Sequence, residues 1–446
     1  MDLRKHDKIF RYLFLFLVIA FFSFCYTCFF LYVTGDEMWN YGFAYNILNG
    51  LIPYRDFNMI VTPLYSFLGS GMIWLFGEYL YSFHILDAIL VGVTMLMLFR
   101  MIGFRSFLVY PFILIWEIPS YNFLCLFWLF VILFLTHYNK DDDILVGVII
   151  GLLFLTKQTV GFCLLIPFVF YSSSKKKAII SFLIPILLFL VYLIYNNALF
   201  QFIDYCFLGM FDFSKSNKIF SIFSFLELFL LIFLFIDFIK QRGRNKQLSY
   251  ILAFQIIILP IMDFYHFCCV LPSVVYYFVR KCNSFKVCFV LGTIIFFFFI
   301  CYLSVLLEKK PSFYSDESFM YMRVNYSDIS SMDFHDKLDF ILKYSDQKLF
   351  LFVRNAYLYK ILMDEPINKY DLINNGNMGY HGAEKYILEI DNLCNKENCF
   401  FVIDTDLFDN KKESVQMNQE ILEYVFNHYF FIDEYGSLRV YSNISY

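Results

Sequence analysis

Long apolar runs recur between residues 9 and 306, and they constrain the fold more than any other feature of the chain. The chain is 60% hydrophobic and 22% aromatic, whereas a soluble globular protein is nearer half apolar. An apolar run of roughly 18 residues is long enough to cross a bilayer as a helix. The first run, 9–33, is too long for a cleaved signal peptide and lacks a small-residue cleavage site, so we expect a retained helix. The pattern predicts a polytopic α-helical membrane protein.

The positions of Lys and Arg predict the direction in which each run crosses the membrane. The N-terminal stretch MDLRKHDKIFR is basic, which places it in the cytoplasm. With about eleven transmembrane helices, every later basic cluster falls on the same side. Residues 63–76 form a short run broken by glycines, which we interpret as an interfacial or re-entrant helix. The expected spans are 9–33, 81–101, 107–117, 121–136, 144–156, 161–171, 178–195, 219–239, 248–261, 268–279 and 287–306.

The polar tail, 308–446, is expected to lie outside the cytoplasm as a small α/β domain. Its segments KLFLFV, CFFVID, FFIDEYG and LRVYS are typical of short strands, and they alternate with amphipathic helices at 383–390 and 417–428. We therefore expect a transmembrane module at 1–307, with a first extracytoplasmic loop at 34–62, followed by the α/β domain. Cys394 and Cys399 in the tail either close a small disulfide loop or remain free thiols.

Four groups of polar residues interrupt the apolar part of the chain, and the expected topology puts all of them on the outer face. An ionisable residue at membrane depth costs about 2.5 to 3.5 kcal/mol on insertion scales, so it is commonly kept for a function. The four groups are Asp36 with Glu37, Arg55 with Asp56, Lys157 with Gln158, and Asp263 with His266.

Each group also has a purely structural interpretation. The sequence Thr34-Gly35-Asp36 suits the start of a helix, where an acidic side chain is stabilised. Arg55 and Asp56 are neighbours and can pair with each other in a surface turn. Both interpretations stay open beside the functional ones.

Lys157 is the polar residue that is hardest to explain structurally. It interrupts the apolar stretch GLLFLTKQTVGFCLLIPFVF with no carboxylate nearby in the sequence, so it needs a distant anion or water. Asp263 and His266 are three positions apart, which places them on one face of a helical turn, where a hydrogen bond is the simpler interpretation. Two ligands do not make a metal site, so we assign no metal ligand, and we predict no definite cofactor while leaving a divalent cation open.

Together these groups suit an inverting group transfer outside the cytoplasm. A carboxylate acts as general base on an acceptor hydroxyl, which attacks a sugar C1 while the leaving group departs from the opposite face. A lipid phosphate that leaves needs Lys or Arg to stabilise its charge. Nucleotide sugars are absent on that side, so a lipid-linked donor is the consistent one.

The opening loop, GDEMWNYGFAYNILNGLIPYRDFNMIVTPLYSFL, resembles the first extracytoplasmic loop of GT-C glycosyltransferases. The most similar subgroup is the family 39-like set, which includes protein O-mannosyltransferases and aminoarabinose transferases. The later GLLFLTKQTVG resembles the glycine-led hairpin of that family with its central Lys. The residues that match the loop pattern are the acidic pair Asp36 and Glu37, then Ala44, Gly50, Pro53, Tyr54, Asp56 and Pro63.

The resemblance covers roughly the first half of the chain and implies a GT-C-like catalytic module, with roles for some of its residues. Asp36 would be the catalytic base and Glu37 a supporting acid. Lys157 and Arg55, with Gln158 beside Lys157, would bind the donor lipid phosphate. One proline precedes Leu64 where the family often has two. The remaining supporting or acceptor-side candidates are Asp56, Glu117, Asp263 and His266.

The function expected is a membrane glycosyltransferase that moves a sugar from a polyprenyl-phosphate donor to a hydroxyl of a lipid, cell-envelope glycan or protein. Its partners would be that donor, the acceptor and the lipid bilayer, with no nucleic acid. Its location would be a bacterial plasma membrane, as a multi-pass protein with a cytoplasmic N-terminus. The alternatives are a transporter or flippase for a lipid-linked glycan, an oligosaccharide polymerase, and a structural scaffold. A transporter would need broken helices or charges near the midplane, and a polymerase would need arginine-rich outer loops.

Overall fold

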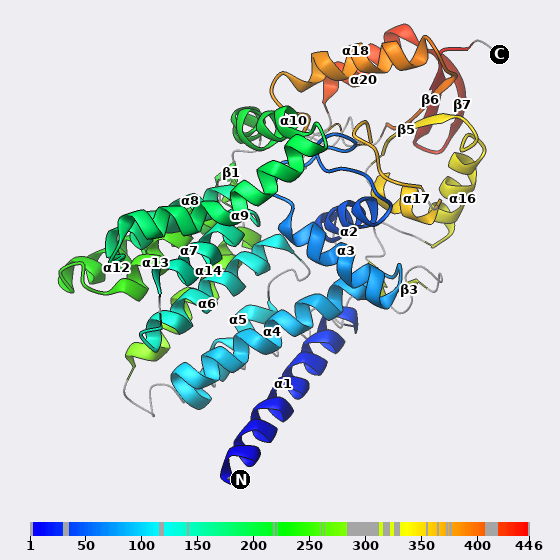
Figure 1. Ribbon diagram of the computed structural model, residues 1–446. Helices are drawn as coiled ribbons and strands as arrows, with labels where there is room; N and C mark the ends of the chain where they lie inside the picture. The colour runs from blue at the N-terminus through cyan, green and yellow to red at the C-terminus, as the bar shows by residue number, and fades with distance from the viewer. Residues whose placement is uncertain are drawn as a thin grey trace. The chain divides into compact units, whose positions relative to one another are not determined.

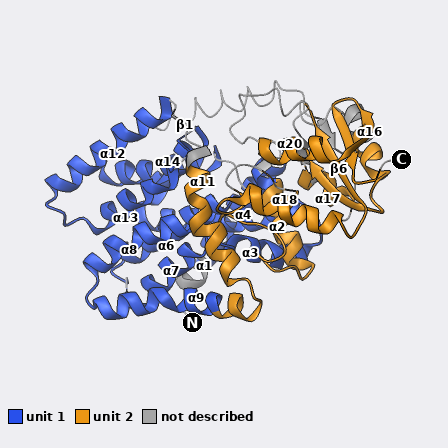
Figure 2. Cartoon of the chain, turned by 90° about the horizontal axis from the view of Figure 1, so that it is seen from above, with its two compact units in different colours: residues 1–37, 62–190, 219–324 blue, residues 38–61, 191–218, 325–446 orange. Residues whose placement is uncertain are grey.

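The chain folds into two compact units, each assembled from separate stretches of the sequence (Figure 2). The first comprises Met1–Glu37, Thr62–Leu190 and Ile219–Val324, and the second comprises Met38–Val61, Val191–Lys218 and Asn325–Tyr446. The computed structural model describes residues 3–29, 35–115, 120–140, 142–216, 219–220, 222–259, 261–262, 264–282, 312–314, 322–324, 331–353, 356–363, 365–371, 373, 377–405 and 418–444.

The first unit consists mostly of apolar helices, and Figure 1 draws the helices as coiled ribbons. Helix α1 packs along α4, α4 also contacts α3 and α6, and α8 packs against α7 and α13. The helices are α1 (Leu3–Phe29), the first turn of α2 (Gly35–Leu48), α3 (Leu64–Phe76), α4 (Tyr81–Ile102), η1 (Gly103–Leu108), α5 (Tyr110–Leu114), α6 (Tyr121–His137), α7 (Asp143–Phe154), α8 (Gln158–Tyr171), α9 (Lys175–Tyr195), α12 (Ile222–Lys240), α13 (Lys246–Phe254), η3 (Gln255–Ile258) and α14 (Phe264–Lys281). Two short strand pairs accompany them: β1 (Ile219–Phe220) with β2 (Ile261–Met262), and β3 (Ser312–Tyr314) with β4 (Met322–Val324).

The lengths and hydropathy of these helices confirm a polytopic helical membrane protein. Four candidate spans lie among the described residues: Ile9–Cys28, Tyr81–Leu108, Lys175–Tyr195 and Ile222–Lys240. The described part of the predicted span 107–117 ends at residue 115 and holds the end of η1 and the five-residue α5, and 287–306 lies outside the described residues. The count of eleven spans therefore stays a prediction. Shorter apolar helices are Leu64–Phe76, Tyr121–His137, Asp143–Phe154, Gln158–Tyr171 and Lys246–Ile258.

Helix starts in this unit are fixed by polar side chains that the sequence supplies at the cap positions. The Ser120 hydroxyl accepts a hydrogen bond from the Asn122 N–H at 3.0 Å, which starts α6. The Asp142 carboxylate accepts from the Ile144 N–H at 2.7 Å, which starts α7. Each cap satisfies a backbone donor that a helix leaves without an internal partner.

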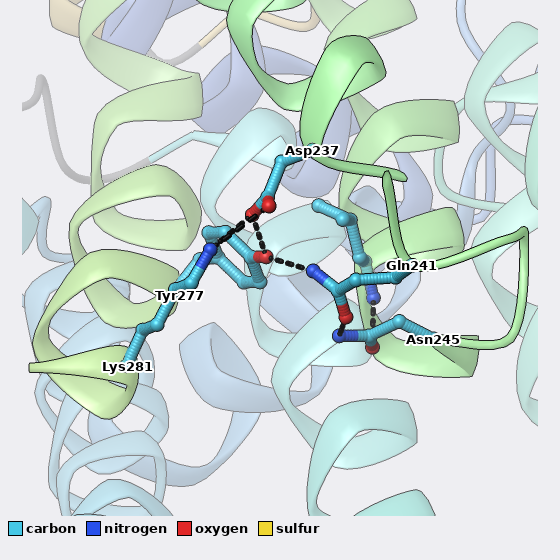
Figure 3. Close-up of polar contacts among 6 residues, drawn as sticks. Asp237, Gln241, Asn245, Tyr277 and Lys281 are labelled. Carbon is cyan, nitrogen blue, oxygen red and sulfur yellow. Dashed lines mark hydrogen bonds and ion pairs between the residues drawn. The ribbon is translucent and has the colours of Figure 1, made fainter. Parts of the chain in front are cut away.

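Helices α12 and α14 are joined by a polar cluster near one end (Figure 3). The Asp237 carboxylate accepts hydrogen bonds from the Tyr277 hydroxyl and from the Lys281 ammonium, the latter at 2.7 Å. The Gln241 amide donates to the Tyr277 oxygen at 2.8 Å, and the Asn245 amide donates to Gln241 at 2.8 Å. The cluster thereby ties the end of α12 to the end of α14.

The second unit contains a four-stranded mixed sheet with helices around it. The strand order is β5-β6-β8-β7, with β5 parallel to β6 and the other neighbours antiparallel. Its strands, β5 (Lys348–Phe352), β6 (Cys399–Asp404), β7 (Phe430–Tyr435) and β8 (Leu438–Ser442), match the strands expected from the sequence. Its helices are α2 from Met38 onward, α10 (Leu199–Ile203), η2 (Asp204–Leu208), α11 (Gly209–Ser216), α16 (Ser331–Leu342), α17 (Ala356–Leu362), α18 (Gly382–Cys394) and α20 (Gln419–His428).

The core of this sheet explains why β5 and β6 are nearly continuous apolar runs in the sequence. In β6 every residue from Cys399 to Ile403 is buried, as expected for a strand covered on both faces. The rings of Phe350 and Phe401 stack with their centroids 4.8 Å apart. Cys394 at the end of α18 forms a disulfide with Cys399 at the start of β6. The disulfide is therefore the alternative that the structure adopts.

Candidate functional site

The break between α7 and α8 sets the position of Lys157 in the first unit. Its N–H still donates to the Leu153 carbonyl at 2.9 Å, but its own backbone is extended, with φ −152° and ψ 109°. The chain then turns back closely. A Cβ added to Gly161 would lie 2.4 Å from the Phe154 Cα, so only glycine permits this approach. The glycine-led hairpin thus places a lysine at the tip of two apolar helices.

The segment before α3 is fastened to the same break. The Thr62 hydroxyl donates to the Phe154 carbonyl at 2.7 Å, and the Leu64 N–H donates to the Leu155 carbonyl at 2.9 Å. These bonds satisfy carbonyls that the end of α7 leaves without helical partners. The proline-led start of α3 and the Lys157 hairpin therefore form one structural element.

The Lys157 ammonium is held by neutral oxygens. It donates to the Asn122 side-chain oxygen at 3.0 Å and to the Ile257 carbonyl at 3.3 Å, and it lies 5.5 Å from the centroid of the Tyr121 ring. Among the described residues no carboxylate lies within ion-pair distance of it, although the Asp36 charge acts on it at longer range. An ammonium with neutral partners keeps its charge available for an anionic ligand.

The two neighbouring acids Asp36 and Glu37 lie in the first turn of α2 but in different surroundings. Asp36 is exposed, whereas Glu37 is only 3% exposed. A Glu37 carboxylate oxygen lies 2.7 Å from the His84 Nε2 on α4. The Asp36 charge also acts on Tyr121. Asp36 thus starts a helix, as the structural interpretation held, and it also carries an accessible carboxylate on the same unit as Lys157.

A second buried acid, Asp87, lies one turn after His84 on α4. It is fully buried and accepts a hydrogen bond from the Tyr65 hydroxyl of α3 at 2.9 Å. The Glu37 charge also acts on Asp87 and on Tyr65. Sequence reasoning missed His84, Asp87 and Tyr65. The available signal was two ionisable residues inside the apolar run 81–101, which the cost of burying charge in a membrane marks as unusual.

Arg55 and Asp56 belong to the second unit, where they pair with each other. The Arg55 Nε and a terminal nitrogen reach the two Asp56 oxygens at 2.8 and 2.7 Å, and the Ile52 N–H donates to Asp56 at 2.7 Å. Burial alone would raise the pKa of Asp56, but these hydrogen bonds outweigh it and hold the pKa below its usual value. The hydrogen bond with Asp56 correspondingly raises the pKa of Arg55. The self-paired turn is therefore present, and a role in phosphate binding stays a prediction.

The remaining predicted site residues are only partly described. Gln158 is buried in the first turn of α8, beside Lys157. His266 is half-buried in the first turn of α14, whereas Asp263 and Glu117 lie outside the described residues. Within the described part of the chain, no group of three His, Cys, Asp or Glu residues is arranged to hold a metal ion.

The first unit thus brings together an exposed carboxylate, a buried carboxylate and an ammonium that lacks a close carboxylate partner among the described residues. The exposed carboxylate of Asp36 can take a proton, because it is reachable from solvent. The Lys157 ammonium can bind an anion. Glu37 is buried against His84 and is suited to hold the first turn of α2 rather than to meet a substrate.

The fold is similar to that of a protein of known structure. The crystal structure of ArnT from Cupriavidus metallidurans bound to undecaprenyl phosphate matches with a TM-score of 0.60 and 11% sequence identity, over 98% of each chain. The apo structure of the same protein matches with a TM-score of 0.58 and 10% identity, again over 98% of each chain. No protein-family model and no curated protein sequence matches the chain. The similarity extends over both units and confirms the GT-C-like fold that the opening loop predicted.

Proposed function

We propose that the protein is a membrane glycosyltransferase that uses a polyprenyl-phosphate-linked sugar as donor. The observation that carries the proposal is the presence of an exposed Asp36 and of Lys157 in the same unit of a fold similar to ArnT, a protein whose structure holds undecaprenyl phosphate. A fold alone hosts many activities, so the proposal depends on this pair. The acceptor is a hydroxyl of a lipid, cell-envelope glycan or protein.

In the proposed reaction Asp36 is the general base and the sugar configuration inverts. The acceptor hydroxyl attacks the sugar C1, a new C1–O bond forms, and the bond from C1 to the phosphate oxygen breaks on the opposite face. The hydroxyl proton passes to the Asp36 carboxylate, and the polyprenyl phosphate leaves as an anion. Lys157 stabilises the charge that develops on this phosphate. Glu37, held by His84, fixes the turn that carries Asp36.

The proposed orientation has the N-terminus in the cytoplasm and the tail outside it, in a bacterial plasma membrane. The Cys394–Cys399 disulfide supports this orientation, because disulfides persist in oxidising compartments and are rare in the cytosol. The lipid-linked donor is consistent with the same side, since such donors serve reactions where nucleotide sugars are absent. Labelling of a cysteine introduced at position 55 by an impermeant reagent tests the orientation, and protection of that cysteine in intact cells would reverse it.

The Asp36→Asn variant tests the catalytic assignment. Purified protein is supplied with a panel of radiolabelled polyprenyl-phosphate sugars, and transfer to membrane lipid, glycan and protein fractions is measured. We expect transfer by the wild type and a loss of about 10²-fold or more in the variant, the scale of general-base catalysis. Asp142→Asn is the matched control, because Asn caps α7 as well as Asp does. Equal transfer by Asp36→Asn and the control would contradict the assignment.

Two variants of Lys157 separate donor binding from folding. Lys157→Gln keeps hydrogen bonding to Asn122 but removes the charge, so the KM for the donor should rise while thermal unfolding changes little. Lys140→Gln, an exposed lysine after α6, should leave the KM unchanged. If the protein moves the donor from one leaflet of a vesicle membrane to the other without transferring its sugar, it is instead a flippase.

A further inference from the structure

A large apolar cavity lies in the first unit between α8, α12 and α13. Its volume is about 610 Å³, within the range of small-molecule sites. Ile166 and Phe170 on α8 line it and are each 71% exposed, so it opens at the surface of the helices. In a membrane protein that surface faces lipid. Further apolar lining residues are Leu231, Phe238, Leu252 and Leu259.

The cavity is elongated along one face of α12. Its lining residues on that helix run from Ser224 to Phe238, which corresponds to about 21 Å at 1.5 Å per residue. This length exceeds half the hydrocarbon core of a bilayer, about 15 Å. At the Phe238 end, the Tyr171 hydroxyl donates to the Gly243 carbonyl at 2.6 Å. The cavity therefore has the length and the lining expected for an extended hydrocarbon chain.

Near its other end this apolar cavity contains polar groups without partners. Glu227 is 4% exposed, and neither of its carboxyl oxygens accepts a hydrogen bond from any described residue. Gln255 is 1% exposed; its amide nitrogen donates to the Ile251 carbonyl at 2.8 Å, but its oxygen has no partner within the described ranges. An acceptor left without a hydrogen bond at such a depth is destabilising, so natural proteins rarely keep one without a reason.

The chemistry of this lining selects the kind of polar group that fits. Three acceptor oxygens, two on Glu227 and one on Gln255, call for a ligand that donates hydrogen bonds. Neither Lys nor Arg is among the described residues that line the cavity. A phosphate, which carries only acceptor oxygens and charge, would lie against a carboxyl group with no cation beside it. The cavity therefore favours a hydroxyl over a lipid phosphate.

We propose that this cavity is a lateral binding site for a hydroxyl-bearing membrane lipid, whose hydrocarbon chain lies along α12 and whose hydroxyl donates to an acceptor oxygen of Glu227 or Gln255. The site is separate from Lys157, although η3 borders both. The Ile257 carbonyl accepts from Lys157, while Gln255, Ile256 and Ile258 line the cavity. A bound lipid would thereby adjoin the segment that holds the Lys157 ammonium.

Photo-cross-linking of the purified full-length protein in phosphatidylcholine nanodiscs tests this site. Three diazirine probes share one alkyl chain and end in a hydroxyl, an amine or a phosphate monoester. We expect the alcohol probe to label residues of α8, α12 and α13, and an unreactive alcohol of the same length to compete with it. Equal labelling by all three probes, or a preference for the amine or phosphate probe, would overturn the proposal.

Variants of the lining provide the matched controls. Glu227→Leu should weaken the apparent affinity of the alcohol probe about tenfold, and Ala253→Trp should abolish labelling by filling the cavity. Phe229→Leu, on the same helix but 68% exposed and outside the cavity lining, should change nothing. Glu227→Leu should also unfold no more readily than the wild type, because it removes buried acceptors without partners. Unchanged alcohol labelling in both lining variants would mean that no lipid occupies the cavity. The assay uses no sugar donor, so its outcome is independent of the proposed transferase activity.

Discussion

The buried pair of Glu37 and His84 should contribute far more to stability than a surface ion pair. Their side chains are 4% and 1% exposed, and a Glu37 carboxyl oxygen lies 2.7 Å from the His84 Nε2 between α2 and α4. Removing one member of a buried pair strands the other and costs about 3 to 5 kcal/mol. His84→Leu should therefore lower the free energy of unfolding by this amount, because Glu37 then stays buried without its partner.

The double variant separates pairing from packing. Glu37→Leu together with His84→Leu removes both polar groups, and such replacements are often close to neutral. We expect the double variant to recover most of the stability lost in His84→Leu, so its loss should be well below the sum of the losses in His84→Leu and Glu37→Leu alone. Unfolding is followed in detergent micelles by titration with sodium dodecyl sulfate.

Two results would refute this reasoning. A loss below about 1 kcal/mol in His84→Leu would mean that the pair behaves like an exposed one. Losses that simply add in the double variant, within about 0.5 kcal/mol, would mean that the two residues act independently. Sugar transfer by the double variant gives a separate measurement. If this variant is stable and keeps the donor KM but has a lower kcat, then Glu37 positions the turn that carries Asp36.

Three smaller predictions concern other contacts. Asp56→Asn should destabilise the protein by less than about 1 kcal/mol at pH 7, since Arg55 is 43% exposed. The pKa of Asp56 is lowered in the folded protein. The difference in unfolding free energy between the wild type and Asp56→Asn should therefore be complete above about pH 3.9. It should vanish as the pH falls through the pKa of Asp56 in the folded protein, which an unfolding titration at several pH values measures. Replacing Cys394 and Cys399 by Ser should cost roughly 2 kcal/mol, as expected for so short a loop, and a reducing agent should have the same effect on wild-type unfolding. Tyr277→Phe should lower the free energy of unfolding by about 1 to 3 kcal/mol, because its partner Asp237 is mostly buried. Lys281→Met should lower it by less than about 1 kcal/mol, because Lys281 is 57% exposed. Equal losses in the two unfolding curves would contradict this order.

The sequence predicts the elements of this fold better than their contacts. The strands β5 to β8 follow from short apolar runs between turns, and α6 to α9 from apolar runs, because local periodicity determines both. The burial of Glu37 did not follow, since its partner His84 lies on another helix. Lys157 was expected to need an anion or water, and its described partners are the neutral oxygens of Asn122 and Ile257, which lie far away in the sequence.

In the opening loop, too, the sequence predicts the helical turn but not the contacts of its two acidic residues. Adjacent residues on a helix point about 100° apart, so two neighbouring acids cannot share one environment. In α2 this separation buries Glu37 against His84 and leaves Asp36 exposed, on the same unit as Lys157. The buried acid lies against His84, and the exposed one is reachable from solvent. An acidic pair at this point therefore does what a single acid could not, because one carboxylate cannot be both buried for stability and exposed for chemistry.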